Sequence, residues 1–337
     1  MESAENLHIP VYLGVDVGGT SIKIGIVDDS GRSLAHGNID TEHEKGPQDG
    51  VDRIIAFARE LLTTTEVTWE KIVAIGLGTP GTMDIKKGML LHMPNMSGWD
   101  DFPIRDYLSE QAGKPVAFVN DANAAAYGEY WVGRGQEYES LIMFTLGTGV
   151  GGGIIVHDNS LDGEHSHGSE CGHIIIDSSP DARICPCGLS GHLEAYVSAR
   201  SVALRTVEQL QSGSESSLQQ VLQNQETITA LDVANHAEQG DALALQIVKE
   251  TAEYLASGIV SAMHIIDPDI IVLGGAMNFG GHEQQTGRMF LERIRERVYE
   301  LTFPVLVENT IIDFATLGSA CGYIGAAGVA RRQLGSV

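Results

Sequence analysis

Two stretches of the sequence share one pattern, in which an apolar strand runs into a turn rich in glycine and threonine and out into a second strand. The first is Leu13–Lys23 and the second is Phe144–Gly153. Glycine adopts backbone conformations that other residues avoid, so both stretches are predicted to form tight β-hairpins. Such a repeat in each half of one chain indicates a duplicated fold. At 337 residues the chain has room for two lobes with a ligand cleft between them.

Apolar periodicity predicts the elements that surround each hairpin. In the first half the expected order is βββαβαβα, and the second half repeats that order loosely. We therefore expect an α/β protein with a small N-terminal α/β lobe over residues 1–121, onto which a C-terminal helix at about 318–337 packs back, and a larger α/β lobe with a metal-binding loop over 122–317. The expected strands are Val11–Val17, Ser21–Val27, Ser33–Ile39, Ile72–Leu77, Pro115–Val119, Ser140–Leu146, Gly152–His157, Gly172–Asp177, Asp269–Leu273 and Thr310–Phe314, and the expected helices include Val51–Leu62, Ile104–Gln111, Asn123–Trp131 and Thr286–Tyr299.

One segment stands apart by its composition. Residues 209–226 are rich in Ser, Gln and Glu, so we expect a solvated helix pair or a mobile insertion there.

The charge of the chain limits its partners. Lys and Arg number 21 against 45 Asp and Glu, so the net charge is 21 − 45 = −24. Such a field repels nucleic acid and anionic membranes, but a small phosphorylated ligand can still bind where backbone N–H groups and Mg²⁺ supply positive potential. The acidic start and the lack of a long apolar run favour the cytoplasm over secretion or a membrane. The spacing of the four cysteines shows no disulfide framework.

The turn of the first hairpin suits a phosphate group. Asp16-Val17-Gly18-Gly19-Thr20 ends a buried strand, so its glycines can expose N–H groups while Asp16 and Thr20 offer oxygens to a phosphate or hydrated Mg²⁺. An ordinary hairpin is the alternative. The similar second turn, Leu146–Gly153, favours phosphate binding because two such turns could hold a nucleotide from both sides.

A further glycine pair, Gly274-Gly275, follows the apolar run Ile270–Leu273. Glycine at a strand exit lets a flat base or a ribose approach the backbone. A simple strand exit is the alternative, so this pair carries weight only together with the two hairpins.

The candidate general base is Asp121. It follows Asn120 where the strand Pro115–Val119 ends and an Ala-rich helix begins, which is where α/β folds carry ligand chemistry. Phosphoryl transfer to an alcohol needs a carboxylate near the attacking hydroxyl to accept its proton. The alternative is a helix N-cap, a position that Asp favours.

Four residues form a candidate metal site: His173, Cys185, Cys187 and His192. Thiolate and imidazole are the ligands that zinc prefers, and four of them close a tetrahedral structural site with no open position for water. Free thiols or a strained local disulfide are the alternatives. A zinc ion here would fix the loops that carry Glu170 and Glu194.

Together these motifs resemble the ROK family (repressor, open reading frame, kinase) of the actin-like sugar kinase superfamily, and its bacterial glucokinases in particular. The resemblance runs nearly end to end and implies a two-lobed, ribonuclease H-like duplicated fold that phosphorylates a hexose, glucose first, with ATP and Mg²⁺. The matching pieces are Asp16–Thr20, Gly78–Gly81, Asn120–Asn123, Leu146–Gly153, Glu170–His173, Cys185–Glu194, Leu273–Gly275 and Leu317–Ala320.

The same resemblance implies individual residue roles, with Asp121 as the base and His173 touching both zinc and sugar. One position departs from the family, which usually has a third cysteine where this chain has His192. The exchange makes the zinc centre less negative by one charge, which places its zinc affinity in question. The implied sugar contacts are Gly81, Asn95, Asn120, Asp121, Glu170, His173 and Glu194, and the implied nucleotide contacts are Gly18, Gly19, Thr20, Lys23, Thr148, Gly149, Gly274 and Gly275. Asp16 joins the nucleotide candidates through its place in the first hairpin turn.

Other functions fit the same motifs. A kinase for N-acetylmannosamine, N-acetylglucosamine or fructose would share them, and so would a sugar-sensing ROK regulator. Such regulators carry a DNA-binding domain before the first phosphate turn, for which the sequence leaves no room, and the acidic charge also argues against one. A polyphosphate donor would favour a basic track that this acidic sequence does not show. The family also suggests a homodimer.

Overall fold

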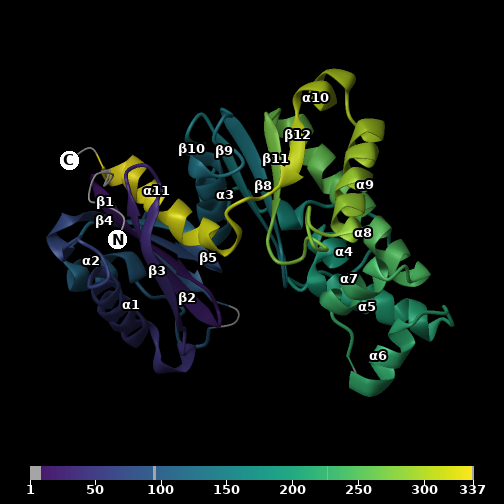
Figure 1. Ribbon diagram of the computed structural model, residues 1–337, viewed down its shortest axis with the longest axis horizontal. Helices are drawn as coiled ribbons and strands as arrows, with labels where there is room; N and C mark the ends of the chain where they lie inside the picture. Colours follow the sequence, from purple (N-terminus) through teal and green to yellow (C-terminus); the bar gives the residue numbers. More distant parts are fainter. Residues whose placement is uncertain (1–8, 94–95, 226, 336–337) are drawn as a thin grey trace. The chain divides into compact units, whose positions relative to one another are not determined.

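The computed structural model describes residues 9–93, 96–225 and 227–335. It is an α/β structure with two mixed five-stranded sheets (Figure 1). Their strand orders are β3-β2-β1-β4-β7 and β10-β9-β8-β11-β12. In each sheet the first strand of the repeat lies centrally, with the hairpin strands on one side and two later strands on the other. The duplication predicted from the two hairpins is therefore confirmed at the level of sheet topology.

The first sheet is built around β1, which pairs antiparallel with β2 and parallel with β4. The outer pairs are antiparallel between β2 and β3 and parallel between β4 and β7. Its strands are β1 (Val11–Val17), β2 (Ser21–Asp28), β3 (Ser33–Asp40), β4 (Ile72–Thr79) and β7 (Val116–Asn120).

Helices cover both faces of the first sheet. Side chains alternate between faces along a strand, and Leu13 and Val15 belong to a core that includes Ile54 of α1 (Pro47–Leu62) and Leu108 of α2 (Ile104–Ala112). Gly14 faces the other way, onto α11 (Cys321–Leu334).

Glycines let α11 approach the sheet closely. A Cβ atom at Gly14 would lie 1.9 Å from the carbonyl oxygen of Tyr323, and one at Gly76 would lie 1.8 Å from that of Ala326. Any side chain at either position would push the helix away. Helix α11 also packs against α3 (Asp121–Val132), where Gly325 meets the backbone of Ala124. The last described helix is thus part of the core around β1 and β4.

In the second sheet, β11 pairs in parallel with both β8 and β12, and β10 pairs antiparallel with β9. All five residues of β11 are buried, as its unbroken apolar sequence predicts. The strands are β8 (Ser140–Leu146), β9 (Val150–Val156), β10 (Asn159–Ser160), β11 (Ile270–Gly274) and β12 (Ile311–Phe314), and the helices that follow them in this half are α4 (Glu194–Val197), α5 (Ala199–Gln211), α6 (Leu218–Gln225), α7 (Ala230–Glu238), α8 (Ala242–Ile266), α9 (Gln285–Leu301) and α10 (Pro304–Asn309).

One predicted strand is wrong. Residues Gly172–Asp177 form no strand. Instead, Cys171–His173 is a turn of 3-10 helix, and Ile175 makes only an isolated bridge to His192. The cause is the close approach of Gly172 to the preceding hairpin, since a Cβ atom there would lie 2.0 Å from the carbonyl oxygen of Val150. The chain must turn at this point.

Two further segments differ from or refine the sequence expectations. A short hairpin of β5 (Thr82–Asp84) and β6 (Met89–His92) was not predicted. Within 209–226, α5 ends and α6 forms, and the Oγ atoms of Ser216 and Ser217 donate to the carboxylate of Asp241.

The structure divides into two compact units. One comprises Met1–Glu137, Gly153–Ser169 and Thr316–Val337, and the other comprises Tyr138–Gly152 and Glu170–Ala315. Across the described ranges, none of the helices has the length and apolar character that a membrane crossing requires.

Candidate functional site

Asp121 is the first residue of α3, directly after β7. The residue that caps the helix is Asn120, whose Oδ1 accepts hydrogen bonds from the backbone N–H groups of Ala122 at 2.9 Å and Asn123 at 3.2 Å. Asp121 Oδ1 also accepts from Ala122, at 2.8 Å. The main cap is therefore Asn120, so capping alone does not account for an acid at Asp121.

A loop from the same unit fixes the first turn of α3. The Nδ2 group of Asn123 donates to Oδ1 of Asp162 at 3.1 Å, and the hydroxyl of Ser160 donates to the same oxygen at 2.7 Å. Burial raises the pKa of Asp162 above its ordinary value, although the Ser160 hydrogen bond opposes the shift. The turn that carries Asn120 and Asp121 is thus held by its own cap and by a neighbouring loop.

The first hairpin turn is closed by the Gly18 N–H, which donates to the carbonyl oxygen of Ser21 at 3.0 Å. Thr41, a buried residue that sequence reasoning missed, donates its hydroxyl to the Gly18 carbonyl at 2.6 Å. Gly19 and Thr20 remain exposed at the tip, as a phosphate-binding turn requires.

Two charged side chains flank this turn on paired strands. Asp16 on β1 lies opposite Lys23 on β2, and the Lys23 ammonium donates to the Asp16 carboxylate at 3.2 Å. Burial raises the pKa of Asp16, and Lys23 counteracts this only in part. A carboxylate oxygen of this kind is a ligand that Mg²⁺ prefers, so the residues present fit a hydrated magnesium ion.

The predicted sugar contacts of the first unit lie near the strand ends. Gly81 follows β4, with a φ of 81°, and Thr79 pairs with Asn120 across β4 and β7. Asn95 lies outside the described residues.

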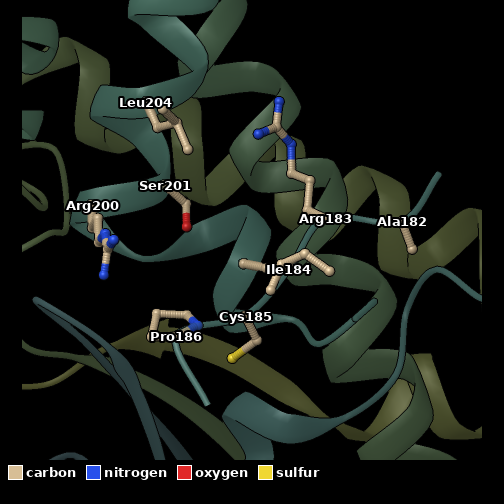
Figure 2. Close-up of a pocket in the computed structure, with 9 residues that line it drawn as sticks. Ala182, Arg183, Ile184, Cys185, Pro186, Arg200, Ser201 and Leu204 are labelled. Atoms are coloured by element: carbon tan, nitrogen blue, oxygen red, sulfur yellow. The ribbon is translucent and has the colours of Figure 1, made fainter. Parts of the chain in front are cut away.

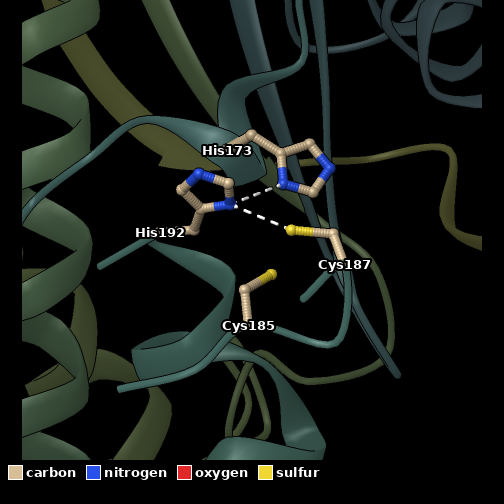
Figure 3. A group of neighbouring side chains, drawn as sticks. All are labelled: His173, Cys185, Cys187 and His192. Atoms are coloured by element: carbon tan, nitrogen blue, oxygen red, sulfur yellow. Dashed lines mark hydrogen bonds between the residues drawn. The ribbon is translucent and has the colours of Figure 1, made fainter. Parts of the chain in front are cut away.

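The four predicted zinc ligands form one cluster. One ligand atom each from His173, Cys185, Cys187 and His192 lies within 4.8 Å of all the others. Figure 3 shows the four side chains pointing toward a common centre. His173 comes from the 3-10 turn and the other three from the loop before α4, so two separate segments converge.

Distances within the cluster fit a zinc ion. The Nδ1 atom of His192 lies 3.1 Å from Nδ1 of His173 and 3.2 Å from Sγ of Cys187 (Figure 3). Ligand atoms of a tetrahedral zinc site lie about 3.3–3.8 Å apart, as follows from the usual zinc–ligand bond lengths. Small shifts would thus complete the coordination.

Electrostatics in the cluster are compatible with a metal. Burial lowers the pKa of His192, and His173 lowers it further, which favours the neutral imidazole that binds metals. Burial raises the pKa of Cys185 to about 12, and a bound Zn²⁺ would reverse that preference because a coordinating thiol loses its proton. Cys171 lies outside the cluster, is buried, and has a pKa raised to about 12 by burial.

The second hairpin turn, defined here as Leu146–Val150, lies in the same unit as the cluster. Its Gly147 N–H donates to the carbonyl oxygen of Gly149 at 3.0 Å, and Thr148 is exposed at the tip. Gly275 follows β11 with a φ of 89°, and a Cβ atom there would lie 2.1 Å from the carbonyl oxygen of Leu146. The two glycine segments predicted for the nucleotide therefore meet, with Gly274 at the end of β11.

Glu194 begins α4, next to the cluster. Its Oε2 accepts a hydrogen bond from the Val150 N–H at 2.8 Å, and its Oε1 accepts from the Cys185 thiol at 3.7 Å. Glu170 precedes the 3-10 turn, where its carbonyl accepts from the His173 N–H. No sequence signal predicts the link between Glu194 and Val150, because any residue type can supply a backbone N–H.

A cavity of about 470 Å³ is lined by residues 182–186 together with Ala195, Arg200, Ser201 and Leu204. Figure 2 shows Arg183 and Ile184 on one side and Arg200 and Leu204 of α5 on the other. Arg183 is ion-paired with Glu208. Cys185 is the one residue that lines the cavity and also belongs to the metal cluster, so the cavity lies outside the predicted sugar and nucleotide residues.

Among known proteins, the chain is similar in sequence to glucokinases and to a putative repressor. The glucokinase of Halalkalibacterium halodurans is 33% identical over 326 residues, covering 97% of this chain and 96% of that protein. A putative xylose repressor from Caldicellulosiruptor is 26% identical and matches 95% of this chain and 78% of its own length.

Solved structures agree with these relatives. The ROK hexokinase of Thermus thermophilus has a TM-score of 0.81 at 31% identity, covering 97% of this chain and all of that one. The ROK family glucokinase of Streptomyces griseus, solved with glucose and AMPPNP, has a TM-score of 0.77 at 31% identity and covers 96% of this chain and 99% of that one. The ROK family profile itself matches residues 12–333. This chain belongs to the ROK family.

Proposed function

We propose that this protein is an ATP-dependent hexose kinase, that glucose is its preferred acceptor, and that Asp121 is the general base. The observation that carries the proposal is the position of Asp121 at the start of α3, held by the Asn120 cap, in a chain 31% identical to a glucokinase that binds glucose and AMPPNP. The 33% identity to a second glucokinase supports the same activity.

The chemistry needs little more than positioning and charge. The sugar hydroxyl oxygen bonds to the γ-phosphorus, the bond from that phosphorus to the β–γ bridging oxygen breaks, and ADP leaves. Asp121 accepts the hydroxyl proton. Mg²⁺ bound with ATP would supply positive charge that offsets the phosphates, and Asp16 would help to hold it.

We assign the sugar to Gly81, Asn95, Asn120, Glu170, His173 and Glu194 together with Asp121, on the strength of the family resemblance. The nucleotide is assigned to the two hairpin turns, with Lys23 and the Gly274–Gly275 segment. A structural zinc ion bound by His173, Cys185, Cys187 and His192 would keep His173 in place. The compact cluster supports that ligand set, including His192 at the position where the family usually has cysteine.

A second candidate is a sugar-binding protein without transferase activity. The similarity to a putative xylose repressor favours it. The two candidates share a sugar site and differ in turnover, so an assay of ADP release separates them.

The test is a coupled ADP-release assay with ATP and Mg²⁺ across a panel of glucose, mannose, fructose, N-acetylmannosamine and N-acetylglucosamine. We expect glucose to give the highest kcat/KM. Sugar binding without ADP release from any member of the panel would contradict the kinase proposal and favour the sensor. A different leading sugar would change the acceptor only.

Asp121→Asn tests the base. We expect kcat to fall by roughly 10²–10⁴ while the Kd for glucose changes little, because an amide keeps the shape but cannot accept the proton. Asp106→Asn is the matched control, since Asp106 also lies in the first turn of a helix in the same unit. Near-normal turnover in Asp121→Asn would remove Asp121 from this role.

A further inference from the structure

The second hairpin turn is held from two sides. One side is the metal loop, defined here as residues 173–194, with Ala199 just after it, and the other is Met277, which follows the Gly274–Gly275 segment. All of these residues lie in one compact unit. On the metal side, the Glu194 carboxylate accepts from the Val150 N–H at 2.8 Å, and the Ala199 N–H donates to the Gly147 carbonyl at 2.9 Å. On the other side, the Met277 N–H donates to the Leu146 carbonyl at 3.0 Å.

The fit around the turn is tight. A Cβ atom at Gly149 would lie 2.6 Å from Oε2 of Glu194, and Gly172 crowds the Val150 carbonyl. If the Glu194 carboxylate changes position, the backbone of the turn must therefore shift as well.

The Glu194 carboxylate also contacts the metal cluster. Its second oxygen lies 3.7 Å from the Cys185 sulfur, while its backbone carbonyl accepts from the Ser201 hydroxyl at 2.9 Å in α5. One side chain thus connects a zinc ligand to a backbone N–H of the hairpin turn. A carboxylate that accepts from a backbone N–H forms one of the stronger classes of hydrogen bond in proteins.

We propose that Glu194 is a positioning residue for the nucleotide, in addition to the sugar contact that the resemblance implies. It holds the second hairpin turn in the conformation that receives the phosphates of ATP, and the Ala199 N–H holds the opposite side of the same turn. This inference rests on the proposed function, because it takes the turn to be a nucleotide site. It makes nucleotide affinity depend on the metal loop even when no sugar is bound.

The experiment measures ADP binding with Mg²⁺ and without sugar, by isothermal titration calorimetry on the full chain. Two variants remove one contact each. Glu194→Ala removes the acceptor for Val150. Ala199→Pro removes the donor to Gly147 and leaves α5 intact, because Ala199 is the first residue of that helix, where proline is favoured, and Ser198 before it is extended.

A matched control exists in another helix of the same unit. Ala242 is the first residue of α8 and follows the extended N-cap Asp241, but α8 supplies none of the hydrogen bonds to the hairpin turn described above. Ala242→Pro introduces the same chemical change at the same helical position. The zinc content and the thermal midpoint of every variant are measured alongside.

We expect Glu194→Ala and Ala199→Pro each to weaken ADP binding about tenfold, the usual scale for a lost hydrogen bond to a charged or preorganised group. Ala242→Pro should bind ADP like the parent protein. Glu194→Gln keeps an acceptor oxygen and should recover most of the ADP affinity, whereas a residue that acts only on the sugar would leave ADP affinity unchanged in all variants.

Two results would overturn the inference and can be told apart. If the parent protein binds ADP and both variants bind it equally well, the positioning role is wrong and the proposed function stands. If the parent protein does not bind ADP, the nucleotide site fails and the inference fails with it. Should Glu194→Ala lose zinc or unfold, Ala199→Pro decides, because Ala199 is not a metal ligand.

Discussion

The two glycine hairpins occupy equivalent places in two sheets of the same strand order, yet they are held differently. The first turn is closed by its own backbone and by Thr41, and it carries a charged pair, Asp16 and Lys23, on its strands. The second turn has one internal hydrogen bond, from the Gly147 N–H to the Gly149 carbonyl, and is also held from outside by Glu194, Ala199 and Met277.

This difference shows how a duplicated motif can diverge without a change of topology. In the first hairpin, side chains of the hairpin itself supply the charge. In the second, the strands supply little charge, and conformation depends on loops that arrive later in the sequence. We therefore expect the second turn to respond to changes in the metal loop and the first turn to be insensitive to them.

Removal of one of the proposed zinc ligands should have the largest effect. We expect Cys187→Ser to lower the free energy of unfolding by roughly 3–5 kcal/mol, because loss of a metal ligand belongs to the most damaging class of substitutions. Hydrogen exchange should rise in residues 173–194 and in the second turn, and stay unchanged in the first. Mass spectrometry of exchanged peptides measures both.

The control for this change is Cys171→Ala, which alters a buried cysteine outside the cluster. It should keep the full zinc content. Equal exchange in the two turns of Cys187→Ser would show that the hairpins are not held independently.

The second largest effect is expected at Gly172, whose backbone lies very close to that of Val150. Gly172→Ala should lower the free energy of unfolding by about 1–3 kcal/mol, since its Cβ would lie 2.0 Å from the backbone carbonyl oxygen of Val150 and one of the two segments would have to shift. Gly147→Ala, within the second turn itself, has open space around its Cβ and should change stability by less than about 0.5 kcal/mol. Urea denaturation of the two variants tests this, and equal losses would contradict the proposed crowding.

The smallest effect concerns the first hairpin and depends on pH. Because burial raises the folded-state pKa of Asp16, this group favours the folded state below its unfolded pKa, and that contribution is lost as pH rises through the folded pKa. At neutral pH the charged, buried Asp16 is therefore a cost. Asp16→Asn should raise the thermal midpoint by a few degrees at pH 7, and the gain should disappear below about pH 4, near the ordinary pKa of Asp.

Calorimetric scans across that pH range measure the effect of Asp16→Asn. Asp49→Asn, at a partly exposed first-turn position of α1 where the carboxylate is ion-paired with Arg53, is the control and should show no such pH-dependent gain. A midpoint for Asp16→Asn that does not change with pH relative to the parent would mean that Lys23 fully compensates the burial of Asp16.

Much of the fold could be predicted because its strands are apolar runs with clear ends. The limits of β1 agree with the sequence prediction, and β8 does as well. The predicted strand at Gly172–Asp177 failed for a tertiary reason, since Ile174 and Ile176 look like strand residues while Gly172 must pass close to Val150. The β5–β6 hairpin escaped prediction because its strands have only three and four residues.

The candidate site was predictable where residue type carries chemistry. Cys185, Cys187 and His192 stand close together in sequence, and His173 joins them in space. Backbone donors carry no such signal, so the contacts of Ala199 and Met277 could not be found in advance. The sequence offered Asp121 as a helix cap, but the main cap of α3 is Asn120. Only the geometry of the turn shows which of these two neighbouring residues caps the helix. The homodimer and the residue roles stay predictions.

The close packing of α11 on the first sheet has a consequence for biosynthesis. Because Gly14 and Gly76 have no side chains, one face of β1 and β4 stays uncovered until α11 packs on it. Helix α11 lies at residues 321–334. A ribosome makes the chain from the N-terminus, so the first sheet must wait for nearly the whole chain before that face is covered. The intervening unit can complete its own core first. The face of the first sheet that α11 covers is therefore completed only after every strand of the second sheet has been made.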